Sequence, residues 1–171
     1  MKAVNKAEVF ALAVADRTKV LIVEDDDDVR LMLSTYLASQ GCDVASAGAA
    51  TEGVSMALTL RPDLILMDLG LPDADGLSAV RALRSNVGFV GTPVLLVTAY
   101  DSMQFRTEAM EAGCVGYMVK PVDPERLLET VRLLTAAGGV KPGTSEGVGD
   151  EGSAGGGLPR YPQANADCPH A

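Results

Sequence analysis

The chain has 171 residues, 47% of them hydrophobic, and a formal net charge of −9 at pH 7. This size and apolar content predict one well-packed domain. The negative charge argues against broad nucleic-acid binding, which requires a basic surface. The one histidine, His170, stands next to the end of the sequence, which excludes histidine-based catalysis and His-ligated metal sites. No apolar run approaches the roughly 20 residues that span a bilayer, so we expect no membrane contact.

The cysteines and the first residues indicate the compartment. Cys42, Cys114 and Cys168 are odd in number and lack the spacing of a zinc site. We interpret them as free thiols in a reducing compartment, and we therefore expect a cytoplasmic protein. Residues 1–17 are predicted to be an N-terminal extension. Its apolar stretch, residues 9–15, is short and follows Glu8, which argues against a secretory signal.

From residue 18 onward, short apolar runs alternate with segments of helical periodicity. Strand-like runs occupy residues 20–23, 43–46, 64–67, 93–97 and 114–119. Helical patterns follow them at residues 29–37, 51–60, 77–83, 103–112 and from Pro124 onward. Gly41 is predicted to end the first helix. This alternation predicts an α/β domain over residues 18–137, built on a five-stranded, doubly wound parallel sheet.

Residues 138–171 have a different composition. They contain nine glycines, four prolines and few large aliphatic residues. Such a segment cannot bury enough apolar surface to offset the entropy lost on ordering, so we expect a disordered tail. Its composition also leaves no room for a helix-turn-helix output domain, and direct contact with nucleic acid is not expected.

Polar residues stand where the predicted strands end. Glu24 and Asp25 follow the first strand, Asp68 the third, Thr98 the fourth and Lys120 the fifth. The carboxyl ends of parallel strands meet at one edge of a sheet, so these groups are expected to surround one shallow pocket. Clustered carboxylates favour a hard divalent cation, and Mg²⁺ fits best. A carboxylate beside a metal ion and an ammonium group is also a nucleophile toward phosphorus.

Three further acids, Asp26 to Asp28, follow the first of these groups. Acidic residues suit the positive end of a helix dipole. We interpret this run as a helix cap and a solvated face.

Four motifs carry a family resemblance. They read VLIVEDD at residues 20–26, LILMDLGLPDADG at 64–76, LLVTA at 95–99 and GYMVKP at 116–121. In this order and spacing, over about 120 residues, they resemble the response-regulator receiver domain, the phospho-accepting module of two-component signalling. Within this family, the chain resembles the single-domain chemotaxis regulators. The resemblance implies a flavodoxin-like fold with strand order 2-1-3-4-5.

The resemblance implies a role for each residue of the predicted pocket. Asp68 would accept the phosphoryl group. Glu24, Asp25, Asp68 and the backbone carbonyl of Gly70 would hold Mg²⁺, Glu24 mostly through water. Lys120 would pair with Asp68 and then with the phosphoryl oxygens, offsetting their charge during transfer.

The resemblance also implies a conformational switch. Thr98 would donate its hydroxyl to the phosphoryl group, and Tyr117 would be the aromatic residue that turns inward in response. The change would remodel the face formed by the fourth helix, fifth strand and fifth helix. The Lys120–Pro121 peptide bond would be cis, as in the family.

Two positions bear on the lifetime of the phosphorylated state. Gly70 and Tyr100 lie two residues after Asp68 and Thr98, where family members tune this lifetime. Neither side chain offers an amide or carboxylate to orient water. We therefore predict slow self-dephosphorylation.

The sequence thus predicts a response regulator that receives a phosphoryl group from a histidine kinase or a histidine phosphotransfer protein and signals to a downstream protein. It would not be an enzyme in the ordinary sense, because it changes only itself. A haloacid-dehalogenase-type phosphatase also uses an aspartate and Mg²⁺, but it requires a second acid two residues later, where this chain has Gly70. An unphosphorylated interaction scaffold with the same fold stays open as the alternative.

Overall fold

The computed structural model describes residues 17–99 and 101–136. The predicted disordered tail and almost all of the predicted N-terminal extension lie outside these residues. The described elements are, in order, β1 (Lys19–Val23), α2 (Asp27–Ser39), β2 (Asp43–Ala47), α3 (Ala50–Leu60), β3 (Leu64–Asp68), α4 (Gly76–Arg84), η1 (Val87–Phe89), β4 (Val94–Thr98), α5 (Met103–Ala112), β5 (Gly116–Val119) and α6 (Pro124–Ala136).

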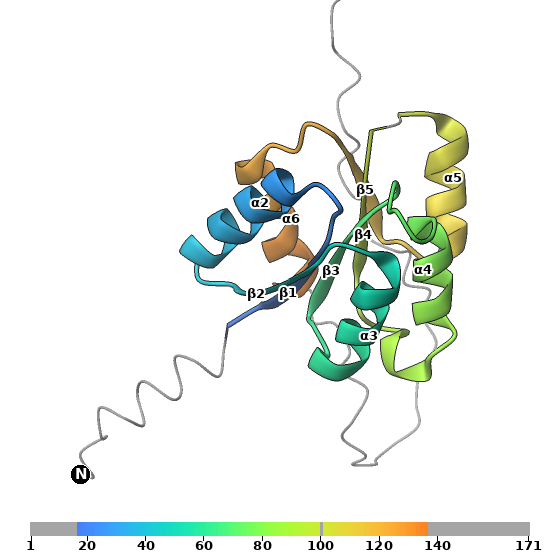
Figure 1. Cartoon of the computed structure of the whole chain (residues 1–171), viewed down its shortest axis with the longest axis horizontal. Helices are drawn as coiled ribbons and strands as arrows, with labels where there is room; N and C mark the ends of the chain where they lie inside the picture. Colours follow the sequence, from blue (N-terminus) through green and yellow to red (C-terminus); the bar gives the residue numbers. More distant parts are fainter. Residues whose placement is uncertain (1–16, 100, 137–171) are drawn as a thin grey trace, which may run out of the picture.

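The five strands form one parallel sheet in the order β2-β1-β3-β4-β5, which confirms the predicted fold class (Figure 1). In the register of this sheet, Val23 of β1 lies beside Met67 of β3. Thr98 of β4 lies beside Val119 of β5. The residues that follow these positions therefore emerge at the same edge of the sheet.

The helices cover both faces of the sheet, with α2 and α6 on one side and α3, α4 and α5 on the other (Figure 1). Successive residues of a strand point to opposite faces. Leu21, Ile65 and Leu96 accordingly pack under α3, α4 and α5, whereas Ile22, Leu66 and Leu95 pack under α2 and α6. The central strands are buried on both faces, which explains their uninterrupted apolar sequences.

The helix boundaries follow local capping chemistry. Asp26 is the N-cap of α2, and its side chain accepts hydrogen bonds from the backbone N–H groups of Asp28 and Val29. Gly41, with φ of +90°, follows the end of the same helix, as predicted. None of the helices in the described ranges is long and apolar enough to cross a bilayer.

One strand start and one short element differ from the predictions, while the other strand ends agree to within one residue. The fifth strand begins at Gly116 rather than Cys114. The backbone N–H of Cys114 instead donates to Ala109 O and completes the end of α5, whose left-handed cap is Gly113. The short 3₁₀ helix η1 was not predicted, because three residues are too few to show a periodic pattern.

Candidate functional site

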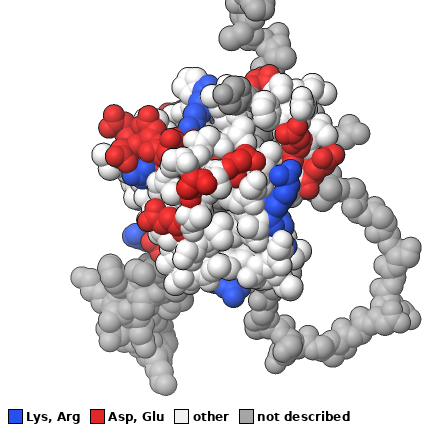
Figure 2. Space-filling view, turned by 45° about the vertical axis from the view of Figure 1, so that its right-hand side comes forward, with Lys and Arg blue, Asp and Glu red and all other residues white. Residues whose placement is uncertain are grey.

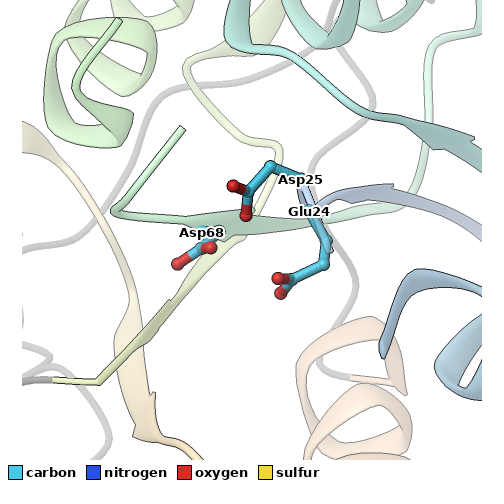
Figure 3. A group of neighbouring side chains, drawn as sticks. All are labelled: Glu24, Asp25 and Asp68. Atoms are coloured by element: carbon cyan, nitrogen blue, oxygen red, sulfur yellow. The ribbon is translucent and has the colours of Figure 1, made fainter. Parts of the chain in front are cut away.

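Three carboxylates converge at the carboxyl edge of the sheet. Glu24 and Asp25 directly follow β1, and Asp68 is the last residue of the neighbouring strand β3. One carboxylate oxygen from each lies within 4.8 Å of the others, around a common space (Figure 3). Glu24 and Asp68 are buried, at 2% and 5% exposure, whereas Asp25 is exposed. The pocket is therefore open to solvent on the side of Asp25.

Lys120 bridges the two buried carboxylates. Its Nζ donates to Glu24 Oε1 at 2.7 Å and to Asp68 Oδ2 at 2.8 Å. Burial raises the pKa of Glu24, the Lys120 hydrogen bond opposes that rise, and the charge of Asp68 adds to it. Burial alone would lower the pKa of Lys120, but its hydrogen bonds to Asp68 and Glu24 raise the pKa above its usual value. The ammonium group thus stays charged between two acids.

The donor set fits a hard divalent cation. All three converging side chains offer oxygen, which Mg²⁺ and Ca²⁺ prefer. Lys120 engages one oxygen of Glu24 and one of Asp68, so the other oxygen of each carboxylate is not bound by Lys120. An acidic cluster that can hold a metal ion is therefore present where the sequence predicts one.

The loop after Asp68 is shaped by close backbone contacts. The N–H of Gly70 donates to Asp68 Oδ1 at 3.3 Å, and Gly70 pairs with Asp75 in an isolated antiparallel bridge. At Gly76, a Cβ atom would lie 2.0 Å from the carbonyl oxygen of Asp68. Only glycine permits this approach, which brings the start of α4 against the end of β3.

Thr98 and Lys120 are linked through the backbone. Thr98 is the last residue of β4 and is buried, at 1% exposure. Its carbonyl accepts a hydrogen bond of 2.8 Å from the N–H of Lys120. The structure therefore places Thr98 at the same edge as the acids. The Lys120–Pro121 peptide bond is cis, as the resemblance implied.

Tyr117 lies in β5, paired with Leu96, and is half-buried. The guanidinium of Arg106 lies over its ring, 4.8 Å from the centroid. Arg106 also forms an ion pair with Asp101, which precedes the N-cap of α5. No sequence pattern connects Arg106 with Tyr117, because the contact joins α5 to a strand that follows it.

Arg30 is a second residue that no sequence pattern connects with the acids. Its Nη1 donates to the carbonyl oxygen of Glu24 at 2.7 Å and to that of Asp25 at 3.3 Å. Its other terminal nitrogen pairs with Asp27. The acidic run thus contains a helix cap, Asp26, and an ion-pair partner for Arg30.

On the face shown in Figure 2, acidic side chains outnumber basic ones and gather over its upper half.

Comparison with known proteins gives the class to which this fold and this pocket belong. The family model for the response regulator receiver domain matches residues 20–132. The chain therefore belongs to the response-regulator receiver-domain family, and the recognition made from its four motifs is confirmed.

Curated relatives extend beyond the matched region. The regulatory protein AtoC of Escherichia coli (strain K12) is 38% identical over 109 residues, covering 64% of this chain and 23% of the relative. The DNA-binding dual master transcriptional regulator RpaA of Synechocystis is 35% identical over 116 residues, covering 68% of this chain and 48% of the relative. The match to these relatives spans about half of their length or less.

Solved structures match over nearly their whole length. A chemotaxis response regulator of Vibrio cholerae superimposes with a TM-score of 0.66 at 33% identity, covering 69% of this chain and 98% of that one. A receiver domain protein of Methanospirillum hungatei gives a TM-score of 0.67 at 28% identity, covering 71% and 96%. The receiver fold thus accounts for the described part of the chain.

Proposed function

We propose that this chain is a response regulator that accepts a phosphoryl group from a phosphohistidine onto Asp68 and signals through a change at the α5–β5–α6 face. In this labelling, α5 and α6 are the fourth and fifth of the described α-helices. The donor would be a histidine kinase or a histidine phosphotransfer protein. The observation that carries the proposal is the arrangement of Asp68, buried at the end of β3, beside two further acids and within 2.8 Å of the Lys120 ammonium.

The transfer is a substitution at phosphorus. An oxygen of Asp68 forms a bond to phosphorus, the bond from phosphorus to the imidazole nitrogen of the donor breaks, and the imidazole keeps the electron pair. The product is an acyl phosphate. Lys120 reaches the oxygens of the group while it moves and offsets their negative charge. The Thr98 hydroxyl would donate to the phosphoryl group once it is attached.

Glu24, Asp25, Asp68 and the Gly70 carbonyl would hold Mg²⁺. When bound, the ion supplies positive charge that lets an anionic phosphoryl group enter an acidic pocket. The chain's own residues prepare for this, because Lys120 already neutralises part of the charge of the two buried acids. We propose that the chain turns over no external substrate and changes only its own aspartate.

The signal would pass through Thr98 and Tyr117. A new dianion on Asp68 draws the Thr98 hydroxyl toward it, and the Tyr117 ring turns into the space released. Tyr117 belongs to β5 and its ring contacts Arg106 of α5, so its movement alters the α5–β5–α6 face.

The downstream partner would bind to this face. The phosphoryl donor would bind beside α2, where Leu31 and Met32 are exposed. We also propose a cytoplasmic setting, which the free thiols of Cys42 and Cys114 support.

The test is the intact mass of the protein after incubation with acetyl phosphate and Mg²⁺. We expect one phosphoryl adduct on the wild type, and none on Asp68→Ala or when EDTA removes the metal. The absence of an adduct on a folded wild-type protein would overturn the proposal and favour the interaction scaffold.

A further inference from the structure

Asp73, in the loop between β3 and α4, binds the start of a different helix. Its Oδ1 accepts a hydrogen bond from the N–H of Ala50 at 2.7 Å. Its Oδ2 accepts from the N–H of Thr51 at 2.9 Å and from the Thr51 hydroxyl at 2.6 Å. The Thr51 hydroxyl contributes most to a lowering of the Asp73 pKa to about 2. Asp73 is therefore ionised at neutral pH and faces the positive end of α3.

Helix α3 has no cap of its own. Its N-cap residue is Ala49, whose extended backbone has the geometry of a cap but whose methyl group cannot accept a hydrogen bond. Asp26, Asp75 and Ser102, in contrast, cap the helices that they directly precede. The cap of α3 comes instead from a residue more than twenty positions later. The same three hydrogen bonds thus complete α3 and tie the loop after β3 to it.

The loop that Asp73 ties down is the loop that leaves the phosphoacceptor. Its base is closed by the bridge between Gly70 and Asp75 and by a hydrogen bond of 3.1 Å from the N–H of Gly76 to Leu69 O. The tip of the loop, which contains Asp73, lies against α3. The path of the backbone at Gly70 is therefore held from both sides.

The start of α3 also lies next to the other acidic loop. The N–H of Glu24 donates to the carbonyl of Ala47 at 3.1 Å, and Ala47 ends the strand that leads into α3. The segment from Ala47 to Thr51 thus contacts the backbone of Glu24 on one side and Asp73 on the other. It holds the two loops that supply the acids of the pocket.

We propose that Asp73 is a positioning residue for the metal and phosphoryl site: by binding the start of α3, it fixes the position of the Gly70 loop relative to the loop of Glu24 and Asp25. This inference rests on the proposed function of the pocket. Asp73 touches neither the metal nor the phosphoryl group, and it acts through the backbone that carries the Gly70 carbonyl.

The experiment must separate two effects of Asp73: its link between the Gly70 loop and α3, which we call the tether, and its capping of α3. Asp73→Ala removes both the tether and the cap. The double variant Ala49→Ser with Asp73→Ala gives α3 a local cap, since serine suits the extended backbone at position 49, but it does not restore the tether. Asp63→Ala is the control, because Asp63 accepts a backbone hydrogen bond from Lys19 at the opposite edge of the sheet. Asp73→Asn serves if the alanine variant does not fold.

Each variant is measured in three ways: the midpoint of thermal unfolding, the dissociation constant for Mg²⁺ alone by calorimetry, and the rate of phosphorylation by acetyl phosphate. We expect Asp73→Ala to weaken Mg²⁺ binding about tenfold, the lower end for residues that support metal ligands. The double variant should regain the unfolding midpoint of the wild type and keep the weak Mg²⁺ binding. The control should bind Mg²⁺ as the wild type does.

Two results would overturn the inference while leaving the proposed function intact. One is recovery of both stability and Mg²⁺ affinity in the double variant, which would make Asp73 a helix cap only. The other is wild-type Mg²⁺ affinity in Asp73→Ala. If the wild-type protein itself neither binds Mg²⁺ nor takes up a phosphoryl group, the proposed function fails, and this inference fails with it.

Discussion

The ammonium of Lys120 lies 2.8 Å from Asp68 and donates at the same time to Glu24, at 2.7 Å. One cation therefore balances two buried acids. We expect Lys120→Met to lower the free energy of unfolding by about 3 kcal/mol without Mg²⁺, because it leaves two buried carboxylates close together without a counter-charge. The same variant should gain more stability from Mg²⁺ than the wild type does. Thermal unfolding with and without Mg²⁺ checks both effects.

Lys19→Met is the control for this variant, because Lys19 is an exposed lysine at the other end of β1. It should leave the effect of Mg²⁺ on the unfolding temperature unchanged. An equal Mg²⁺ effect in Lys120→Met and the wild type would contradict the role of Lys120 as the counter-charge of the pocket.

Gly70, in the loop after β3, and Gly76, the first residue of α4, should tolerate alanine very differently. A Cβ at Gly76 would lie 2.0 Å from the backbone oxygen of Asp68, whereas a Cβ at Gly70 would have no atom within 4 Å. We expect Gly76→Ala to cost about 3 kcal/mol or more, since the obstructing atom belongs to the backbone, and Gly70→Ala to cost under about 1 kcal/mol. Urea unfolding of the pair provides the measurement. Similar stabilities would show that the loop can move away from α4.

The strands follow from the sequence because each is a short apolar run followed by a helical pattern, whereas their order in the sheet was implied by the family resemblance. The clustering of Glu24, Asp25, Asp68 and Lys120 follows as well, since parallel strands bring their carboxyl ends together. The roles of these residues in phosphoryl transfer stay predictions.

Other features depend on contacts that sequence spacing does not reveal. Asp73 looks like an ordinary loop acid, and its partners Ala50 and Thr51 precede it by more than twenty residues. Arg106 has no pattern that connects it with the Tyr117 ring. The fifth strand begins later than its apolar run because Cys114 completes the preceding helix. In each case tertiary contacts decide the outcome.

Stability should depend on pH through Asp73, whose pKa falls from 3.8 to about 2 on folding. A carboxyl group with a lowered pKa stabilises the fold above its unfolded pKa, and this contribution is lost as the pH falls toward the folded value. The stability difference between the wild type and Asp73→Ala should therefore be full at pH 7 and should shrink between about pH 4 and about pH 2. Urea unfolding across this range, with Asp63→Ala for comparison, checks the prediction. A difference that stays constant down to about pH 2 would contradict it.

Phosphorylated protein should lose its phosphoryl group slowly, because the side chains at positions 70 and 100, glycine and tyrosine, carry neither an amide nor a carboxylate to orient water. Gly70→Asn supplies an amide at a position with open space and should shorten the lifetime. Gly70→Ala adds a side chain without a polar group and should not. The decay of the phosphoryl adduct by intact mass distinguishes them. A wild-type half-life of seconds would contradict the prediction.

The most direct test of the account is the location of the phosphoryl group. After reaction with acetyl phosphate and Mg²⁺, borohydride reduces an acyl phosphate to an alcohol, which marks the modified residue for peptide mass spectrometry. We predict that Asp68 alone is converted, and that Lys120→Met reduces its conversion. Conversion of Glu24 or Asp25 in its place, or none in a folded protein, would contradict the assignment of Asp68 as the phosphoacceptor.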